Sequence, residues 1–192
     1  MIKKCFIDTE TTGLWSEKQD EVHQISCIIT DDHAKPLDYI NLKFRPSETA
    51  LENMHPEALQ KCRLTKESIR SRSLDFSQAF AKFEEFLNKH VNRFDKTDKM
   101  QFIAYNAPFD LKFIQKYFLQ NNNDYYGSYF WRPEICVYRE LAWMLQNERD
   151  QFPSMHLSDM CKYAGIEFSE EHAHDAMYDT KKTLELFRQI YL

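Results

Sequence analysis

Residues 2–14 read IKKCFIDTETTGL, in which a short apolar run ends at a carboxylate, a second carboxylate follows two positions later, and a polar turn closes the stretch. The Phe and Ile content predicts a β-strand at residues 2–8. Residues two apart in a strand point to the same face, so Asp8 and Glu10 are expected side by side. Two like charges repel unless a cation lies between them, and carboxylate oxygens suit Mg²⁺ or Mn²⁺. The stretch therefore favours a strand that carries an acidic site at its end, although an inert solvated turn would show the same spacing.

The rest of the sequence predicts one mixed sheet flanked by helices. Strands are expected at residues 2–8, 21–30, 38–44, 101–105 and 129–131. Helices are expected at residues 56–62, 76–91, 109–119, 133–147 and 157–164, and two more begin at caps provided by Thr65 and Asp175, the second running to residue 192. Three strands followed by helices, and then a strand–helix–strand–helix tail, indicate a single α/β domain over residues 1–192.

Composition excludes several classes of protein. The chain has 192 residues, of which 43% are hydrophobic, and its 25 basic and 30 acidic residues give a net charge of −5. Its three glycines, Gly13, Gly127 and Gly165, lie too far apart for a glycine-rich phosphate loop, and the sequence has no G-x-S-x-G serine elbow. Five scattered cysteines, no visible signal peptide and no membrane-spanning run indicate a soluble, cytoplasmic protein without a membrane partner.

A second candidate segment is Asn106-Ala-Pro108-Phe109-Asp110, at the junction of a predicted strand and a predicted helix. Pro108 suits the first turn of a helix, and a carboxylate in that turn is stabilised by the helix dipole even where it has no function. Asp110 also follows the carboxyl end of a strand, where open α/β sheets bind their ligands. That position favours a functional role for Asp110.

A third candidate segment, HAHDAMYD at residues 172–179, enters the last predicted helix. A helical wheel places Asp179 on the same arc as apolar residues such as Leu186. A carboxylate on a core-facing arc needs a partner, and a metal ion is a suitable one. His174 precedes Asp179 by five residues, and His172 is its rival if the helix starts earlier.

The three segments occur in the order and with the spacers of the DEDD superfamily of 3′–5′ exonucleases, in its histidine-bearing (DEDDh) branch of proofreading subunits and ribonuclease T-like enzymes. Asp8-Thr-Glu10-Thr-Thr-Gly13 resembles the first motif, Asn106-Ala-Pro-Phe-Asp110 the second and His174-Asp-Ala-Met-Tyr-Asp179 the third. The resemblance extends over about residues 3–190. It implies a ribonuclease-H-like fold: a five-stranded mixed sheet with an antiparallel second strand and helices on both faces.

The resemblance implies a role for each residue of the acidic set. Asp8, Glu10 and Asp179 would bind one of two Mg²⁺ or Mn²⁺ ions, and Asp8 would bridge to the second, to which Asp110 contributes directly or through water. His174 would be the general base. The chemistry accounts for these residue types independently, because two divalent ions about 4 Å apart stabilise both oxygens of an in-line phosphodiester displacement. Histidine, which titrates near neutrality, can accept the proton of the attacking water.

The resemblance also assigns the substrate to the turn after the first strand, with Leu14 wedged near the terminal bases. The residues expected to bind substrate are Thr11, Thr12, Gly13, Leu14, Asn106 and Phe109, with Tyr105 as a further stacking neighbour. A net charge of −5 counts against a long duplex footprint, since proteins that bind nucleic acid over a large area are usually basic. That charge fits a protein that contacts only a few nucleotides of a single strand.

The sequence therefore predicts a two-metal 3′–5′ exonuclease that acts on single-stranded nucleic acid, DNA in the first instance, and releases nucleoside 5′-monophosphates. Its expected partners are 3′ ends, with a polymerase or another replication or repair protein as a further candidate. A 3′–5′ exoribonuclease or oligoribonuclease is the first alternative, because the sequence does not reveal how the sugar is discriminated. A non-catalytic nucleic-acid-binding accessory module is the second, and it would be expected to lack part of the acidic set. A scaffold with a chance acidic pocket would show no chelator-sensitive activity.

Overall fold

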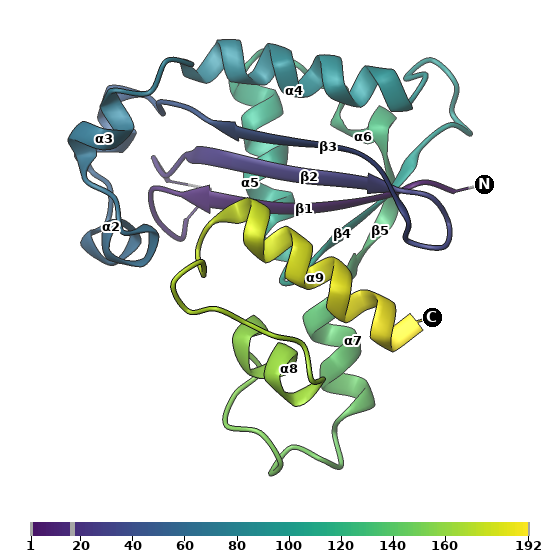
Figure 1. Cartoon of the computed structure of the whole chain (residues 1–192). Helices are drawn as coiled ribbons and strands as arrows, with labels where there is room; N and C mark the ends of the chain where they lie inside the picture. The colour runs from purple at the N-terminus through teal and green to yellow at the C-terminus, as the bar shows by residue number, and fades with distance from the viewer. Residues whose placement is uncertain (1, 16–17, 192) are drawn as a thin grey trace.

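The computed structural model describes residues 2–15 and 18–191, which form one sheet between helices (Figure 1). The strands lie in the order β3-β2-β1-β4-β5; β2 is antiparallel to both neighbours, and β1, β4 and β5 are parallel. They are β1 (Lys4–Thr11), β2 (Val22–Thr30), β3 (Pro36–Lys43), β4 (Met100–Ala104) and β5 (Phe130–Cys136). The predicted five-stranded mixed sheet with an antiparallel second strand is confirmed.

Helices cover both faces of the sheet, as predicted. Side chains alternate along β1, so Cys5 and Ile7 enter one hydrophobic core and Phe6 enters the other. The first core packs under α4 (Phe76–His90), α5 (Ala107–Gln120) and α6 (Tyr126–Tyr129), and the second under α7 (Val137–Met144), α8 (Leu157–Tyr163) and α9 (Ala176–Tyr191). Three short helices, α1 (Glu48–Glu52), α2 (Pro56–Cys62) and α3 (Lys66–Arg70), follow β3, and α2 and α3 lie beyond the carboxyl end of β1 (Figure 1).

Helix starts follow the capping residues that the sequence provides. Thr65 and Asp75 each form a capping box, and Asp175 accepts hydrogen bonds from two N–H groups in the first turn of α9. The caps predicted at Thr65 and Asp175 are confirmed, and Gly165, with φ of 71°, follows α8 as predicted. The expected end of the last helix, residue 192, lies outside the described residues. None of the helices in the described ranges is both long and apolar enough to cross a bilayer.

Two predicted boundaries near the site are wrong. β1 continues to Thr11, three residues beyond the predicted end at Asp8, so Glu10 belongs to the strand. β5 includes Pro133, at which the sequence predicts the start of a helix. This strand lies at the edge of the sheet, where a residue without an N–H group is tolerated because one side of the strand has no neighbour to bond.

Candidate active site

β1 directs its two carboxylates to the face of the sheet that α9 covers. Asp8 and Glu10 alternate in step with Phe6, which packs in the core beneath α9. Antiparallel pairing with β2 fixes their register, with Asp8 opposite Ser26 and Glu10 opposite Gln24. Both acidic residues are half-buried. Their common face is therefore a property of a paired strand and not of a solvated turn.

Asp110 reaches the same end of the sheet from the first turn of α5. Its side chain is only 4% exposed, and its Oδ1 accepts hydrogen bonds from the N–H of Thr9 (2.9 Å) and from Thr9 Oγ1 (2.8 Å). Thr9 lies between Asp8 and Glu10 in the strand, so its side chain points to the opposite face. This contact holds Asp110 against β1. A carboxylate that only stabilised the start of α5 would not need it.

α9 supplies Asp179, and the segment before it supplies His174. Asp179 Oδ2 accepts a hydrogen bond from the N–H of His174 (3.1 Å). The backbone of His174 has φ of 65°, a left-handed conformation that is uncommon for a residue with a side chain. His172 instead packs against Tyr178, with ring centroids 5.6 Å apart. The structure thus brings His174, and not its rival, to Asp179.

Burial of four carboxyl groups in one place raises their pKa values. Burial raises the pKa of Glu10 to about 8 and those of Asp110 and Asp179 to about 7. The pKa of Asp8 lies well above its ordinary value, because of burial and then of the negative charges of the other three groups. Hydrogen bonds to Glu10 and Asp110 oppose these shifts without cancelling them. Negative charge at this place destabilises the folded chain, and a bound cation would remove that cost.

The donor atoms fit a divalent cation. One ligand atom each from Glu10, His174 and Asp179 lies within 4.8 Å of the other two. Asp179 Oδ1 is buried and has no hydrogen-bond partner among the described residues. A buried carboxylate oxygen without a partner is unfavourable unless a cation or an ordered water lies beside it. Carboxylate oxygens suit Mg²⁺ or Mn²⁺, and the imidazole nitrogen close to them would also suit Zn²⁺.

These groups line a cavity of about 480 Å³ at the carboxyl end of β1. The structure brings together all five residues predicted for catalysis in its wall: Asp8, Glu10, Asp110, His174 and Asp179. Of the residues predicted to bind substrate, five line the same cavity, and so does the predicted stacking neighbour: Thr11, Gly13, Leu14, Asn106, Phe109 and Tyr105. Segments that are far apart in the sequence therefore meet around a single space.

Thr12 is predicted to bind substrate, but it does not line the cavity. It is fully buried; its hydroxyl accepts a hydrogen bond from the N–H of Glu21 (3.0 Å) and its carbonyl accepts one from the N–H of His55 (2.8 Å). Thr12 thus fastens the turn after β1 to the starts of β2 and α2. A Cβ at the next residue, Gly13, would lie 2.4 Å from Asp20 Oδ1, so a larger residue there would displace the Asp20 carboxylate, which accepts a hydrogen bond from the N–H of Trp15.

α2 and the residue that precedes it form a wall of the cavity that the sequence does not identify. This wall is lined by His55, Glu57, Ala58, Lys61 and Cys62. Cys62 Sγ donates a hydrogen bond to Glu10 Oε2 (3.2 Å), so α2 contacts the acidic set directly. Lys61 is the single lysine in the cavity wall, which contains no arginine. The sequence carries no signal for these contacts, because a short helix with basic residues is typical of a solvated face.

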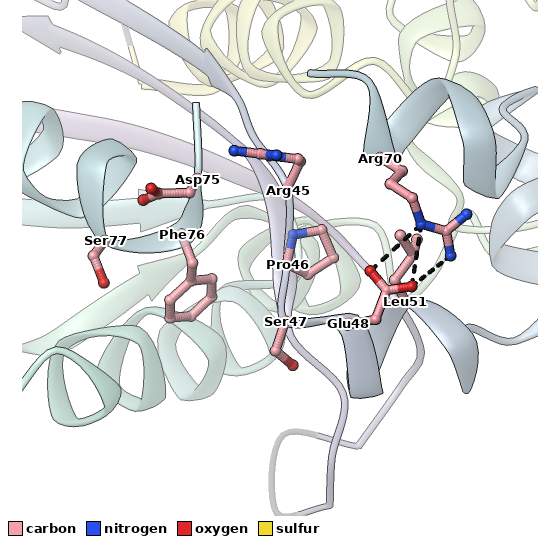
Figure 2. Close-up of a pocket in the computed structure, with 9 residues that line it drawn as sticks. All are labelled: Arg45, Pro46, Ser47, Glu48, Leu51, Arg70, Asp75, Phe76 and Ser77. Carbon is pink, nitrogen blue, oxygen red and sulfur yellow. Dashed lines mark hydrogen bonds and ion pairs between the residues drawn. The ribbon is translucent and has the colours of Figure 1, made fainter. Parts of the chain in front are cut away.

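A second cavity, of about 380 Å³, lies between the chain that follows β3 and the first turn of α4 (Figure 2). Its wall contains two basic and two acidic residues: Arg45, Arg70, Glu48 and Asp75. Arg70 donates through Nε to Glu48 Oε1 (3.1 Å), and its Nη2 pairs with Glu48 and Glu52 at 2.5 Å. Asp75 caps α4. Arg70, Glu48 and Asp75 therefore find partners within the chain, whereas Arg45 Nε is buried without a hydrogen-bond partner among the described residues.

Comparisons with known proteins show the family of the chain. A family model described as an exonuclease matches residues 5–187. Ribonuclease T of Shewanella denitrificans is 29% identical over 188 residues, which cover 96% of this chain and 78% of that protein. Ribonuclease T of Photobacterium profundum is 29% identical over 196 residues, which cover 96% of this chain and 79% of that protein.

Solved structures show the same fold. E. coli exonuclease I in complex with a dT13 oligonucleotide aligns with a TM-score of 0.79 and 22% identity over 99% of this chain. The zinc ion bound form of an E. coli exonuclease I complex with single-stranded DNA aligns with a TM-score of 0.80 and 22% identity, also over 99% of this chain. The chain spans about two fifths of these neighbours, 41% of the first and 40% of the second.

Proposed function

This chain belongs to the exonuclease family, and from that premise we propose that it is a metal-dependent 3′–5′ exonuclease acting on single-stranded nucleic acid. The reaction is hydrolysis of the terminal phosphodiester bond, with release of nucleoside 5′-monophosphates. The observation that carries the proposal is Asp179 Oδ1, a carboxylate oxygen that is buried beside Glu10 and His174 and has no partner among the residues that the structure describes. A protein that only bound nucleic acid would gain nothing from uncompensated negative charge facing a polyanion.

The four carboxylates are the proposed ligands of two divalent ions. Asp8, Glu10 and Asp179 would hold one ion, and Asp8 and Asp110 would hold the other. When bound, such ions offset the charge on the phosphate and stabilise the attacking and leaving oxygens of an in-line displacement. Mg²⁺ or Mn²⁺ is the expected occupant because the ligands are oxygens.

His174 is the proposed general base, which accepts the proton of the attacking water. Its pKa is lowered by burial and by the positive charges of Lys61 and Arg63. A lowered pKa keeps the imidazole neutral at physiological pH, which is the form that can accept a proton. Its exposed position at the edge of the cavity then allows the proton to pass to solvent.

The shape of the site favours strand ends. A cavity of about 480 Å³ is of the size that encloses one small ligand, so it accommodates a terminal nucleotide better than a threaded internal segment. The cavity wall also offers apolar side chains that a base can contact. Leu14 is 64% exposed, Trp15 is 54% exposed and Phe109 is half-buried. Unpaired ends should be preferred, because opening a duplex terminus costs a few kcal/mol that so small a contact area barely offsets.

The test is release of mononucleotides from end-labelled single-stranded DNA, duplex DNA and RNA with Mg²⁺, then with excess chelator. We expect stepwise shortening from the 3′ end, fastest on single strands, abolished by chelation and blocked by a 3′-phosphate. Circular single-stranded DNA should stay intact. Cleavage of the circle by a homogeneous preparation would instead identify an endonuclease built from the same residues.

RNA is the second candidate substrate, and a specific observation favours it: the relatives of known function that match along most of this chain are ribonucleases T. The exonuclease I structures with the same fold contain DNA, so fold does not separate the two sugars. Rates on DNA and RNA oligonucleotides of identical sequence decide between them. A ratio above about 10² in kcat/KM, equivalent to roughly 2.7 kcal/mol, would identify the preferred sugar.

A further inference from the structure

The segment that carries His174 connects α8 to α9 and has little regular structure of its own. Its turns are held by local bonds, such as those from the N–H groups of His172 and Ala173 to the carbonyl of Ser169 (3.1 and 3.2 Å). Ser169 in turn donates its N–H to the hydroxyl of Tyr178 in α9 (2.6 Å). These contacts shape the segment, but they do not fix it relative to β1, where the carboxylates lie.

Arg63 connects this segment to the opposite wall of the cavity. It is the C-cap of α2, in a left-handed conformation with φ of 52°, and its side chain reaches across to the segment before α9. Its guanidinium donates to the carbonyl of Glu170 (2.6 Å) and to the carbonyl of Glu171. A planar guanidinium that donates to two successive carbonyls restrains both position and orientation, which a single contact would not do.

A second connection holds the other side of His174. Asp175 Oδ2 accepts hydrogen bonds from Lys43 Nζ (2.7 Å) and Gln24 Nε2 (3.2 Å), which belong to β3 and β2. His174 thus lies between two attachments, one to α2 through residues 170–171 and one to the sheet through Asp175. Its left-handed backbone is unfavourable for a residue with a side chain and persists only where the surroundings impose it.

We propose that Arg63 is a positioning residue for His174, holding the segment at residues 169–174 so that the imidazole stays within reach of the reacting water. This inference rests on the proposed function, in which His174 is the base. Arg63 does not line the cavity, whereas Lys61, two residues earlier in α2, does. Arg63 therefore acts on the base from outside the substrate site, and its loss should lower kcat without changing KM.

The test compares Arg63→Met and Arg63→Lys in the wild-type and His174→Ala backgrounds, with Arg70→Met as the matched control. Arg70 also bridges two residues through its guanidinium, but it lies in the second cavity (Figure 2). We expect Arg63→Met to lower kcat by about 10- to 100-fold, the scale of a small misplacement of a reacting group. Arg63→Lys should recover part of that loss, KM should stay within about twofold, and Arg70→Met should change neither constant.

The double-mutant cycle separates positioning from other roles, since a residue that acts only through His174 has no effect once the imidazole is gone. Arg63→Met in the His174→Ala background should therefore cost nothing further. An equal loss in both backgrounds, or a rise in KM at unchanged kcat, would overturn the inference and assign Arg63 to general stability or to phosphate contact. A His174→Ala enzyme as active as wild type would overturn the base assignment itself and the inference with it.

Amide hydrogen exchange gives a readout independent of activity. Arg63→Met should accelerate exchange at residues 169–174 and leave the amides of β1 and α5 unchanged, because the attachment to α2 opens without unfolding the sheet. If the amides of residues 169–174 exchange at the same rate in this variant as in the wild type, Arg63 does not hold the segment, and the proposal is wrong.

Discussion

The two cavities differ in where their charges find partners. In the smaller one Arg70 pairs with Glu48 (Figure 2) and with Glu52, and the wall holds two basic and two acidic residues, so its formal charges balance. In the larger one Lys61 is the only lysine or arginine beside six acidic residues: Asp8, Glu10, Asp20, Glu57, Asp110 and Asp179. Burial makes this imbalance costly, because like charges in a poorly solvated site repel far more than they do in water.

The excess of negative charge separates the larger cavity from the smaller one, whereas an unpartnered buried atom occurs in both, Asp179 Oδ1 in the larger and Arg45 Nε in the smaller among the described residues. Exposed ion pairs such as those of Arg70 contribute about 0–1 kcal/mol each and ask for nothing from outside the chain. A buried carboxylate oxygen such as Asp179 Oδ1 is retained in spite of its cost. The contrast between the cavities is therefore a physical argument for a cation-binding site that does not depend on similarity to other proteins.

The largest expected effect comes from removing charge in the larger cavity. Asp179→Asn and Asp8→Asn should each reduce nuclease activity to the background of the assay, because each deletes a proposed metal ligand. Neither should lower the stability of the metal-free protein, since each relieves repulsion among the carboxylates. Kinetics and thermal unfolding of the same preparations measure both effects. Activity near the wild-type level in either variant would refute the two-metal assignment.

The next largest effect concerns the histidine. His174→Ala should lower kcat by about 10²- to 10⁴-fold, the usual contribution of a positioned proton acceptor, with metal affinity nearly unchanged. Titration calorimetry with Mn²⁺ checks the affinity. A large fall in affinity would mean that His174 is a ligand, which its closeness to Glu10 and Asp179 permits. His172→Ala is the control, and a greater loss there would reverse the assignment of the base.

A moderate effect is expected on stability as the pH changes. The carboxyls of Glu10, Asp110 and Asp179 have pKa values of about 7–8 in the folded chain, against about 4 when unfolded. These carboxyls therefore bind more protons in the folded state between these values, so their contribution to the stability of the metal-free protein should fall as the pH rises from about 4 to about 8, whereas buried His23, whose pKa is lowered to about 3, opposes that fall below about pH 6.5. Unfolding midpoints at pH 5.5 and 8.5 measure this fall.

Two additions sharpen that measurement. Glu10→Gln should flatten the pH dependence, because it removes one of the groups that lose a proton in the folded state. A divalent ion at 100 times its Kd should add about 2.7 kcal/mol of stability at pH 8.5, or a rise on the order of 5–10 °C in Tm for a chain of this size. Stability that rises with pH in the metal-free protein, and a midpoint indifferent to Mg²⁺ and Mn²⁺, would contradict the account of the larger cavity.

The smallest effect is expected in the smaller cavity. Glu48→Gln removes a carboxylate that is 64% exposed and paired with Arg70. We expect at most a small loss in unfolding free energy and unchanged nuclease kinetics, as is usual for an exposed ion pair. A tenfold loss of activity would show that the smaller cavity also takes part in the reaction.

Periodicity and local chemistry predict the parts of the fold that depend on local sequence. The caps at Thr65 and Asp175 and the glycine after α8 satisfy backbone groups within a few residues, so they are visible in the chain. The strand ending at Thr11 is underestimated because Asp8 and Glu10 read as a polar turn. Their side chains are polar because they line a site, and local patterning fails where function overrides it.

In the candidate site, too, local sequence predicts some residues and contacts between distant segments decide the others. Its acidic residues and His174 can be identified from ordered motifs, but the residues that hold them cannot. Thr9, which binds Asp110, and Cys62, which binds Glu10, act through contacts between segments remote in sequence. Thr12 belongs to a motif and yet fastens the turn instead of lining the cavity, since its direction depends on where β1 ends. Packing between elements decides these roles, and no local pattern encodes it.

The cavity is assembled from the first strand and from α9, the last helix described, which packs on the sheet beside β1. A growing chain leaves the ribosome with its N-terminus first, so Asp8 and Glu10 emerge long before Asp179 has been translated. A growing chain therefore displays only part of the acidic set to the messenger and transfer RNA around it. On the proposed function, the metal site of a nascent chain is complete only when α9 has docked on the sheet.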